Sequence, residues 1–212
     1  GIGAATAERL CEEGATVIIG DILGDLAEET AARISKAGGT AIGTYLDGTN
    51  ANSQKDIVAL AVKEFGGLDF FHSNLAGGTG GDNDALDITE EVFDKSVAIN
   101  TKSHLLATQA ALPELLKRGS GAIIYTSSGS ACAGAPVQPA YAMTKTAVHA
   151  LDRVLLSLRF AIPQWYKKEN WLAYYDVYRR PAELPPLSVG VYDFWWYDQE
   201  AADKLKASGV LR

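Results

Sequence analysis

Residues 14–39, GATVIIGDILGDLAEETAARISKAGG, contain a short apolar run followed by a helical pattern. The run at 16–20, TVIIG, is uninterrupted by charge, which is typical of a strand buried on both faces. Residues 25–36 then place Ala, Leu and charged side chains at helical spacing, and Gly38 and Gly39 follow where a helix would end. This stretch therefore predicts one buried strand and the helix that covers it.

The same alternation recurs over the first three quarters of the chain. Further strands are expected at 40–46, 69–73 and 122–126, and helices at 4–13, 52–65, 90–116 and 141–158. Strands of about five residues that alternate with longer helices indicate a parallel sheet with helices on both faces. The predicted fold class is α/β, with a doubly wound, three-layer α/β/α arrangement.

The composition excludes several classes of protein. The 212 residues have a formal charge of −7, which argues against nonspecific binding of nucleic acid. No apolar run is long enough to span a bilayer, and no signal peptide opens the chain. Two cysteines, Cys11 and Cys132, make neither a disulfide framework nor a metal cluster, so we expect no metal and a reducing, cytoplasmic setting.

The composition changes after Leu158. Residues 1–158 hold 19 of the 21 Gly and a net charge of −8, whereas residues 159–212 hold all four Trp and a net charge of +1. Such a shift indicates a domain boundary or a join between unlike sequences. We expect an α/β domain over 1–158 and an aromatic-rich segment of different origin over 159–212, which would cover an exposed face of the first part.

A glycine turn precedes the first helix. Gly1-Ile2-Gly3 would let a pyrophosphate approach the backbone at the helix N-terminus, although taken alone it is better interpreted as a capping turn. Asp21 lies 18 residues after Gly3, near the offset of about 20 at which a carboxylate meets the adenosine ribose. That carboxylate favours NAD over NADP because it repels a 2′-phosphate, while the alternative is a residue that caps the next helix.

A serine, a tyrosine and a lysine form the second candidate site. Tyr141 and Lys145 are four residues apart in a predicted helix, so their side chains share a face. An ammonium beside a phenol stabilises the phenolate, which can then exchange a proton with a substrate oxygen. Ser128 follows a predicted strand, where open α/β sheets bind ligands. Alone, the Tyr–Lys pair is more often a solvated helix face, but together with Ser128 and Asp21 it favours a catalytic site.

These motifs together resemble the short-chain dehydrogenase/reductase family over residues 1–158. Gly1-Ile2-Gly3 resembles the end of that family's glycine loop, and Asn74-Leu75-Ala76-Gly77 resembles its NNAG turn with Leu75 in place of the second Asn. The remaining matches are Asp47, Asn100, Ser128, Tyr141 and Lys145.

The resemblance implies a Rossmann-like fold and hydride transfer between a nicotinamide cofactor and a small alcohol or carbonyl substrate. Tyr141 would be the acid/base, Lys145 would hold the nicotinamide ribose, and Ser128 would position the substrate oxygen. The backbone of Asn100 would hold a water of the proton relay. Cofactor contacts would come from Gly1, Ile2, Gly3, Asp21, Asp47, Asn74, Ala76, Gly77, Tyr141 and Lys145. Homodimers or homotetramers would pack through the Asn100 and Tyr141 helices.

The sequence also departs from that family. The first strand and the start of the glycine loop are absent before Gly1, and nothing after Leu158 resembles the family's next strand. Residues 159–212 instead resemble the C-terminal end of ABC-transporter oligopeptide-binding proteins, through Trp165-Tyr166, Arg180-Pro181 and 195–198. One alternative is therefore a noncatalytic truncated or fused fragment with weak or no dinucleotide binding. The other is a solute-binding module.

The remaining polar residues are given structural roles. His72 is interpreted as a structural strand residue, and the helical His104 and His149 are too far apart for a metal motif. Cys132 is expected to be a small buried residue. Asp82 and Asp84 are expected in a solvated loop.

Overall fold

The computed structural model describes residues 1–78, 80–133, 137–157, 178–179 and 196–197. The chain divides into two compact units, Gly1–Ile162 and Pro163–Arg212. In the second unit, the described residues form β5 (Tyr178–Arg179) and β6 (Trp196–Tyr197), which pair antiparallel. The expected aromatic cover otherwise lies outside the described residues.

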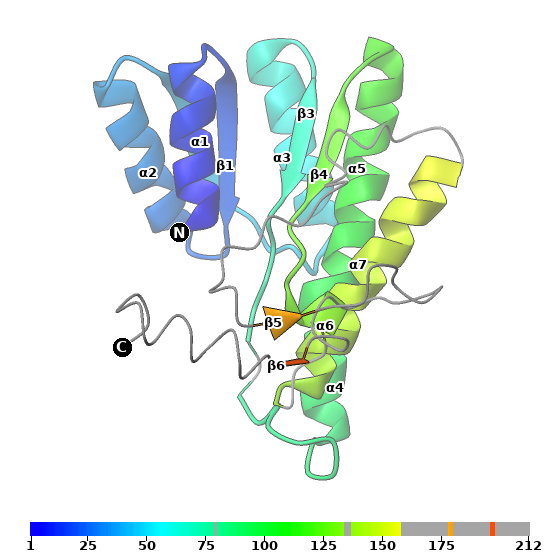
Figure 1. Ribbon diagram of the computed structural model, residues 1–212. Coiled ribbons are helices and arrows are strands. Elements are labelled where there is room, and N and C mark those ends of the chain that lie inside the picture. Colours follow the sequence, from blue (N-terminus) through cyan, green and yellow to red (C-terminus); the bar gives the residue numbers. More distant parts are fainter. Residues whose placement is uncertain (79, 134–136, 158–177, 180–195, 198–212) are drawn as a thin grey trace. The chain divides into compact units, whose positions relative to one another are not determined.

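The first unit alternates strands and helices as predicted (Figure 1). In chain order its elements are α1 (Ile2–Glu12), β1 (Thr16–Asp21), α2 (Gly24–Lys36), β2 (Thr40–Tyr45), α3 (Ala51–Phe65), β3 (Phe70–Ser73), α4 (Glu90–Val97), η1 (Ala98–Lys102), α5 (Ser103–Arg118), β4 (Ala122–Tyr125), α6 (Ser130–Ala133) and α7 (Pro139–Ser157). The one or two helices expected over 90–116 are observed as α4 and α5, joined by η1, a turn of π-helix. In the described part of the chain, no helix combines the length and the apolar character needed to cross a membrane.

The strands form two parallel pairs. β1 pairs with β2 from Thr16↔Thr40 to Asp21↔Tyr45, and β3 pairs with β4 from Phe70↔Ala122 to Ser73↔Tyr125. The two pairs are separate two-stranded sheets, so the expectation of one continuous sheet is wrong for the described residues. The physical reason is that no described strand lies between the two pairs to share hydrogen bonds with both of them.

Two apolar clusters show that helices cover both faces of β1. Val17 and Ile19 pack against the cluster of Ala7 and Cys11 in α1 and Ile34 in α2. Ile18 packs instead against a cluster that joins α3 and α5 and also contacts β3 and β4. Since neighbouring residues of a strand point to opposite faces, this alternation gives the three layers predicted from the sequence.

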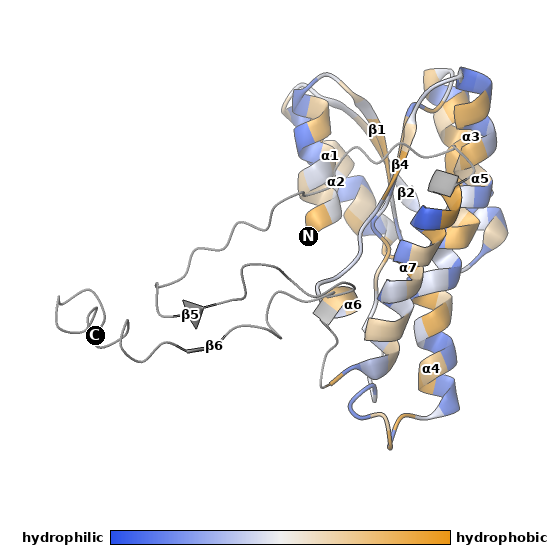
Figure 2. Ribbon diagram, turned by 45° about the vertical axis from the view of Figure 1, so that its right-hand side comes forward, coloured by the Kyte–Doolittle hydropathy of each residue, from blue (hydrophilic) through white to orange (hydrophobic). Residues whose placement is uncertain are grey.

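Helix α2 lies unusually close to β2. An added Cβ at Gly43 would stand 2.3 Å from the backbone carbonyl carbon of Ala27, and Ala27 itself is buried. The hydropathy colouring in Figure 2 shows that α2 is polar along part of its surface. Glycine in the strand thus lets the apolar side of an amphipathic helix pack directly on the backbone.

Candidate active site

Two candidate carboxylates lie at the same edge of the first sheet. Asp21 ends β1 and is exposed, and Asp47 follows β2 and is half-buried. The amide of Leu46 donates to the Asp21 carbonyl at 2.8 Å, which holds the two strand ends together. This edge is the carboxyl end of a parallel pair, the position at which open α/β sheets bind ligands.

Each carboxylate also has a local partner. Asp21 Oδ1 accepts from the Leu23 amide at 2.9 Å, and Asp47 Oδ1 accepts from the Thr49 amide at 2.9 Å and from its hydroxyl at 2.7 Å. The bond to Leu23 uses only Oδ1 of Asp21. Asp21 could therefore hold the Leu23 amide and accept a further hydrogen bond through Oδ2. The structure brings Asp21 and Asp47 to one edge but shows no bond between either of them and Tyr141 or Lys145.

The glycine turn begins α1 without a side-chain cap. Gly1 is the N-cap of α1 and provides no side-chain cap, and an added Cβ there would meet nothing within 4 Å. The first amides of α1 have no side-chain acceptor, and the positive end of a helix favours an anion. Gly3 is closer to its surroundings, because an added Cβ would stand 3.1 Å from Asn74 Nδ2. Gly3 thus brings the α1 turn against the end of β3.

A hydrogen-bond chain fixes Asn74. The Thr126 hydroxyl donates its proton to Asn74 Oδ1 at 2.7 Å. Thr126 Oγ1 is therefore left to accept from His72 Nε2 at 2.9 Å. Burial lowers the pKa of His72, which favours the neutral ring. His72 is in β3 as predicted, and its bond to Thr126 supports the structural role.

Asn100 is fully buried and holds the turn after β3. Its side chain forms a reciprocal pair with Gly77, as Asn100 Nδ2 donates to the Gly77 carbonyl and Oδ1 accepts from the Gly77 amide, both at 3.0 Å. Asn100 Nδ2 also approaches Ser96 Oγ at 3.3 Å. Asn100 lies in η1, where the π-turn widens the helix between α4 and α5.

Tyr141 and Lys145 meet as their spacing predicts. Lys145 Nζ lies 6.0 Å from the centroid of the Tyr141 ring. The ammonium is fully buried and donates to the carbonyls of Thr126 at 3.0 Å and Leu75 at 3.2 Å. Burial lowers the pKa of Lys145. Three protons and two such bonds leave one donor for a further partner.

Ser128 lies at the end of β4, near the helix that contains Lys145. Its Oγ accepts from Ser130 Oγ at 2.9 Å and from the Ser130 amide at 3.3 Å. The neighbouring Ser127 donates to the Lys145 carbonyl at 3.3 Å. The segment after β4 is thus bonded to Lys145 at both Thr126 and Ser127, immediately before Ser128.

The sequence interpretation missed a buried histidine behind Lys145. His104 is fully buried, its Nδ1 lies 2.6 Å from Ser73 Oγ, and its ring meets Tyr125 edge-on at 5.9 Å between centroids. Burial, followed by the nearby Lys145 charge, lowers the pKa of His104 to about 4, and the Leu75 backbone acts in the opposite direction. His104 is four residues after Asn100 and so shares its helix face, which is the signal that could have revealed it.

Two of the expectations for the remaining polar residues are wrong. Asp82 is buried, because its carboxylate is bonded to the first turn of α7. Cys132, in the four-residue helix α6, is exposed rather than buried. Asp84 is exposed as expected. Among the residues that the structure describes, no group of three potential ligands could hold a metal ion.

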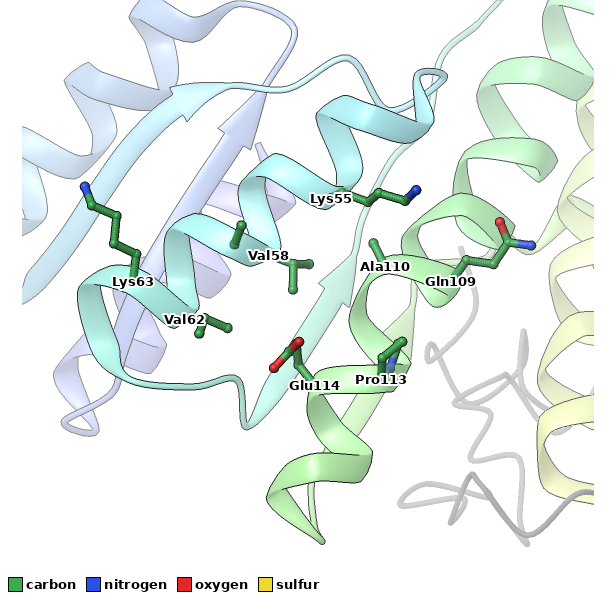
Figure 3. Close-up of a pocket in the computed structure, with 9 residues that line it drawn as sticks. Lys55, Val58, Val62, Lys63, Gln109, Ala110, Pro113 and Glu114 are labelled. Carbon is green, nitrogen blue, oxygen red and sulfur yellow. The ribbon is translucent and has the colours of Figure 1, made fainter.

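A surface pocket lies elsewhere, between α3 and α5. It has a volume of about 430 Å³, and Figure 3 shows Val58 and Val62 of α3 on one side and Ala110 and Pro113 of α5 on the other. Lys55, Lys63 and Glu114 stand around these apolar side chains. None of the predicted site residues lines it, so the candidate site rests on the strand ends.

Comparison with known proteins identifies the family. A family model for short chain dehydrogenases matches residues 1–158. The chain is 40% identical over 156 residues to 2,5-dichloro-2,5-cyclohexadiene-1,4-diol dehydrogenase LinX of Sphingobium indicum, which covers 72% of this chain and 60% of that protein. It is 36% identical over 155 residues to dehydrogenase/reductase SDR family member 4 of Homo sapiens, covering 73% of this chain and 55% of that protein.

A third relative is an uncharacterized oxidoreductase of Thermotoga maritima, 34% identical over 155 residues, with 73% of this chain and 60% of that protein covered. The chain thus spans 60% or less of the length of these relatives. The resemblance of 159–212 to oligopeptide-binding proteins stays a prediction. The match over 1–158 shows that the chain belongs to the short-chain dehydrogenase family, and the two parallel strand pairs and the Tyr141–Lys145 geometry agree with it.

Proposed function

We propose that this chain acts as an NAD(P)-dependent oxidoreductase, transferring hydride between nicotinamide and an alcohol or carbonyl substrate. One observation supports this most strongly: Lys145 Nζ lies 6.0 Å from the Tyr141 ring while it is bonded to Thr126, two residues before Ser128. A buried cation next to a phenol, beside a hydroxyl at a strand end, is the arrangement that proton exchange with a substrate oxygen requires.

Each residue of this group has a defined task. In the oxidation direction, the Tyr141 phenolate accepts the hydroxyl proton of the alcohol, and in reduction the phenol returns it to the carbonyl oxygen. Lys145 stabilises the phenolate through its charge, and its remaining donor serves the nicotinamide ribose. Ser128 positions the same substrate oxygen. When bound, the nicotinamide supplies the carbon that accepts or gives the hydride.

The cofactor is proposed to be NAD, with NADP less favoured. The α1 N-terminus and Gly1 would receive the phosphates, because its first amides have no side-chain cap. The exposed Asp21 would accept from the adenosine ribose and repel a 2′-phosphate. Asp47 would meet the adenine, and Asn74, Ala76 and Gly77 would line the ribose.

The substrate is proposed to be a small alcohol or its carbonyl product. One relative is named for a cyclohexadiene diol, so cyclic secondary alcohols and diols belong first in a substrate panel. The Tyr141–Lys145 group would exchange a proton with one substrate oxygen at a time. This agrees with both simple alcohols and diols and does not distinguish between them.

Self-association is proposed through α5 and α7. Leu105 and Leu116 on α5 and Met143 on α7 are large apolar side chains that are 44%, 54% and 60% exposed. Figure 2 shows apolar residues along α5. A homodimer or homotetramer would cover them, which sedimentation at several concentrations would detect.

A cytoplasmic location is also proposed. Cys11 and Cys132 are free thiols, as is usual in a reducing compartment. Cell fractionation with a tagged chain would test this.

The function is tested by cofactor binding and by turnover. NADH should bind with a change in nicotinamide fluorescence, and the wild type should oxidise at least one alcohol of the panel. Tyr141→Phe should bind NADH with similar affinity and lose turnover, because only the hydroxyl is removed. Absence of NADH binding at millimolar concentration would reject the proposal for this chain and favour the noncatalytic alternative. Quenching of tryptophan fluorescence by short peptides would instead favour the solute-binding alternative.

A further inference from the structure

Helix α7, which contains Tyr141, has no ordinary cap at its start. The residue before it is Gln138, with φ of +67°, and the first helical residue is Pro139. Proline has no amide proton, so the first amides that need a partner belong to Ala140 and Tyr141. The usual capping residues are Ser, Thr, Asp and Asn at the position that Gln138 occupies. The sequence therefore leaves these two amides without a local acceptor.

Asp82 supplies the missing acceptor from the loop after β3. Its Oδ1 accepts from the Ala140 amide at 3.0 Å, and its Oδ2 accepts from the Tyr141 amide at 2.9 Å. The side chain is only 3% exposed, and Ala140 is buried beside it. A carboxylate at a helix N-terminus gains both from the charge-assisted hydrogen bonds and from the helix dipole.

The backbone around Asp82 fits this task. Gly81 has φ of +95°, a conformation that side chains rarely adopt, and an added Cβ there would stand 3.2 Å from Val92 of α4. The loop is therefore fixed against α4 immediately before Asp82. Two residues later, the exposed Asp84 has a partner within the loop, because its Oδ1 accepts from the Leu86 amide at 2.9 Å.

We propose that Asp82 is a positioning residue for Tyr141, an inference that rests on the proposed function. The carboxylate binds the amide of Tyr141 itself, so the loop after β3 determines where the first turn of α7, and with it the phenol, stands. One turn further, Lys145 has separate supports, because Thr101 donates to the Thr144 carbonyl at 3.0 Å and Ser127 to that of Lys145. Loss of Asp82 should therefore displace Tyr141 while leaving Lys145 in place.

This assignment differs from a general role in stability. A residue that only stabilises the fold would, when changed, lower the active fraction and leave the kinetic constants of the folded enzyme intact. A positioning residue instead lowers kcat for the folded enzyme. NADH affinity should change little, because Asp82 bonds only to the backbone of α7, and Lys145, which would hold the nicotinamide ribose, keeps its own hydrogen bonds.

The test compares Asp82→Ala and Asp82→Asn with the matched control Asp84→Asn. Amide hydrogen exchange by NMR should show Ala140 and Tyr141 exchanging at least about tenfold faster in Asp82→Ala, since both hydrogen bonds are lost. Asp82→Asn keeps one acceptor oxygen and should be intermediate. Steady-state kinetics should show kcat lower by about 10- to 100-fold in Asp82→Ala, with the dissociation constant for NADH within about twofold of wild type.

The outcomes separate the two proposals. If the wild type itself neither binds NADH nor turns over any alcohol, the proposed function fails, whereas the exchange rates still show whether Asp82 anchors the first turn. Unchanged exchange at Ala140 and Tyr141 overturns the inference in either case. So does a wild-type kcat in a folded Asp82 variant, or an equal change in Asp84→Asn.

Discussion

The two halves of the first unit are stabilised in different ways. Around β1 and β2, an apolar cluster of Ala7, Cys11 and Ile34 is buried, and close packing at Gly43 joins helix to strand. Around β3, β4 and α7, the largest fully buried side chains are mostly polar, and include Lys145, His104 and Asn100. The first half presents its candidate carboxylate, Asp21, to solvent, while the second buries Asp82, His104 and Lys145.

This difference has a consequence for function. The apolar packing around β1 and β2 does not involve Asp21, so its exposed charge would be available to a bound cofactor. A buried polar network stabilises only if each member keeps its partner, and it holds those members in one geometry. We therefore expect the first half to determine which cofactor binds and the second half to determine whether a proton can move.

The largest effect should come from removing the buried ammonium. Lys145→Met leaves the Leu75 and Thr126 carbonyls without their donor and removes the charge beside Tyr141. We expect kcat/KM to fall by about 10²- to 10⁴-fold in steady-state assays. Lys102→Met, at an exposed position of η1, is the matched control and should stay near wild type. If Lys145→Met and Lys102→Met have comparable activity, the buried ammonium is not what makes the second half necessary for proton transfer.

The second effect is a pH dependence of stability in the enclosed half. The pKa of His104 is about 4 in the folded chain and about 6.5 when unfolded, so the unfolded state binds more protons between these values. The free energy of unfolding should be fully maintained above about pH 6.5 and fall as the pH drops toward 4, by about 3 kcal/mol from this group. Urea unfolding at several pH values measures it.

A variant isolates that contribution. His104→Asn cannot take up a proton, so its unfolding free energy should depend less steeply on pH between 4 and 6.5 than that of wild type. Equal slopes would show that His104 is not held neutral.

The third effect should come from the packed half. In Gly43→Ala the new methyl would stand 2.3 Å from the Ala27 backbone, so α2 and β2 must separate. We expect the free energy of unfolding to fall by about 2 kcal/mol in chemical denaturation. Gly67→Ala is the control, because its Cβ would meet only the Arg118 side chain at 3.6 Å. If both variants lose the same stability, close helix–strand packing is not what holds this half.

The smallest effect should be a change of cofactor preference. Asp21→Asn keeps an acceptor for the Leu23 amide but removes the negative charge. The ratio of NADP to NAD affinity should rise about tenfold, which is about 1.4 kcal/mol, with little change in stability. Titration with both cofactors measures it, and Asp25→Asn, exposed in the first turn of α2, should leave the ratio unchanged.

Local patterns predicted most of the elements and part of the site. The strand at 16–20 and the helix that follows it are confirmed with small shifts at their ends, because periodicity and glycine ends are properties of the local sequence. The Tyr141–Lys145 contact is confirmed for the same reason, since spacing of four residues determines a shared helix face.

Contacts between distant segments were not predictable from such patterns. Asp82 looks like a loop residue because its partner, the start of α7, comes 58 residues later. The sequence does show that Gln138, before α7, is not a usual N-cap residue. It does not show which distant residue accepts from the first amides of α7 instead. The separation into two strand pairs likewise depends on a hydrogen-bonding neighbour, which no single segment specifies.

The π-turn at Ala98–Lys102 gives insertions and deletions different consequences for the helix that follows. A π-turn accommodates one extra residue relative to regular α-helix, and each residue of an α-helix advances by about 100°. Deletion of that extra residue would leave a continuous α-helix in which α4 and α5 keep their phase, although it would move Asn100 from its place opposite Gly77. Insertion of a further residue would instead rotate α5 by about 100°, so that His104 and the buried face of α5 would turn away from β3 and β4.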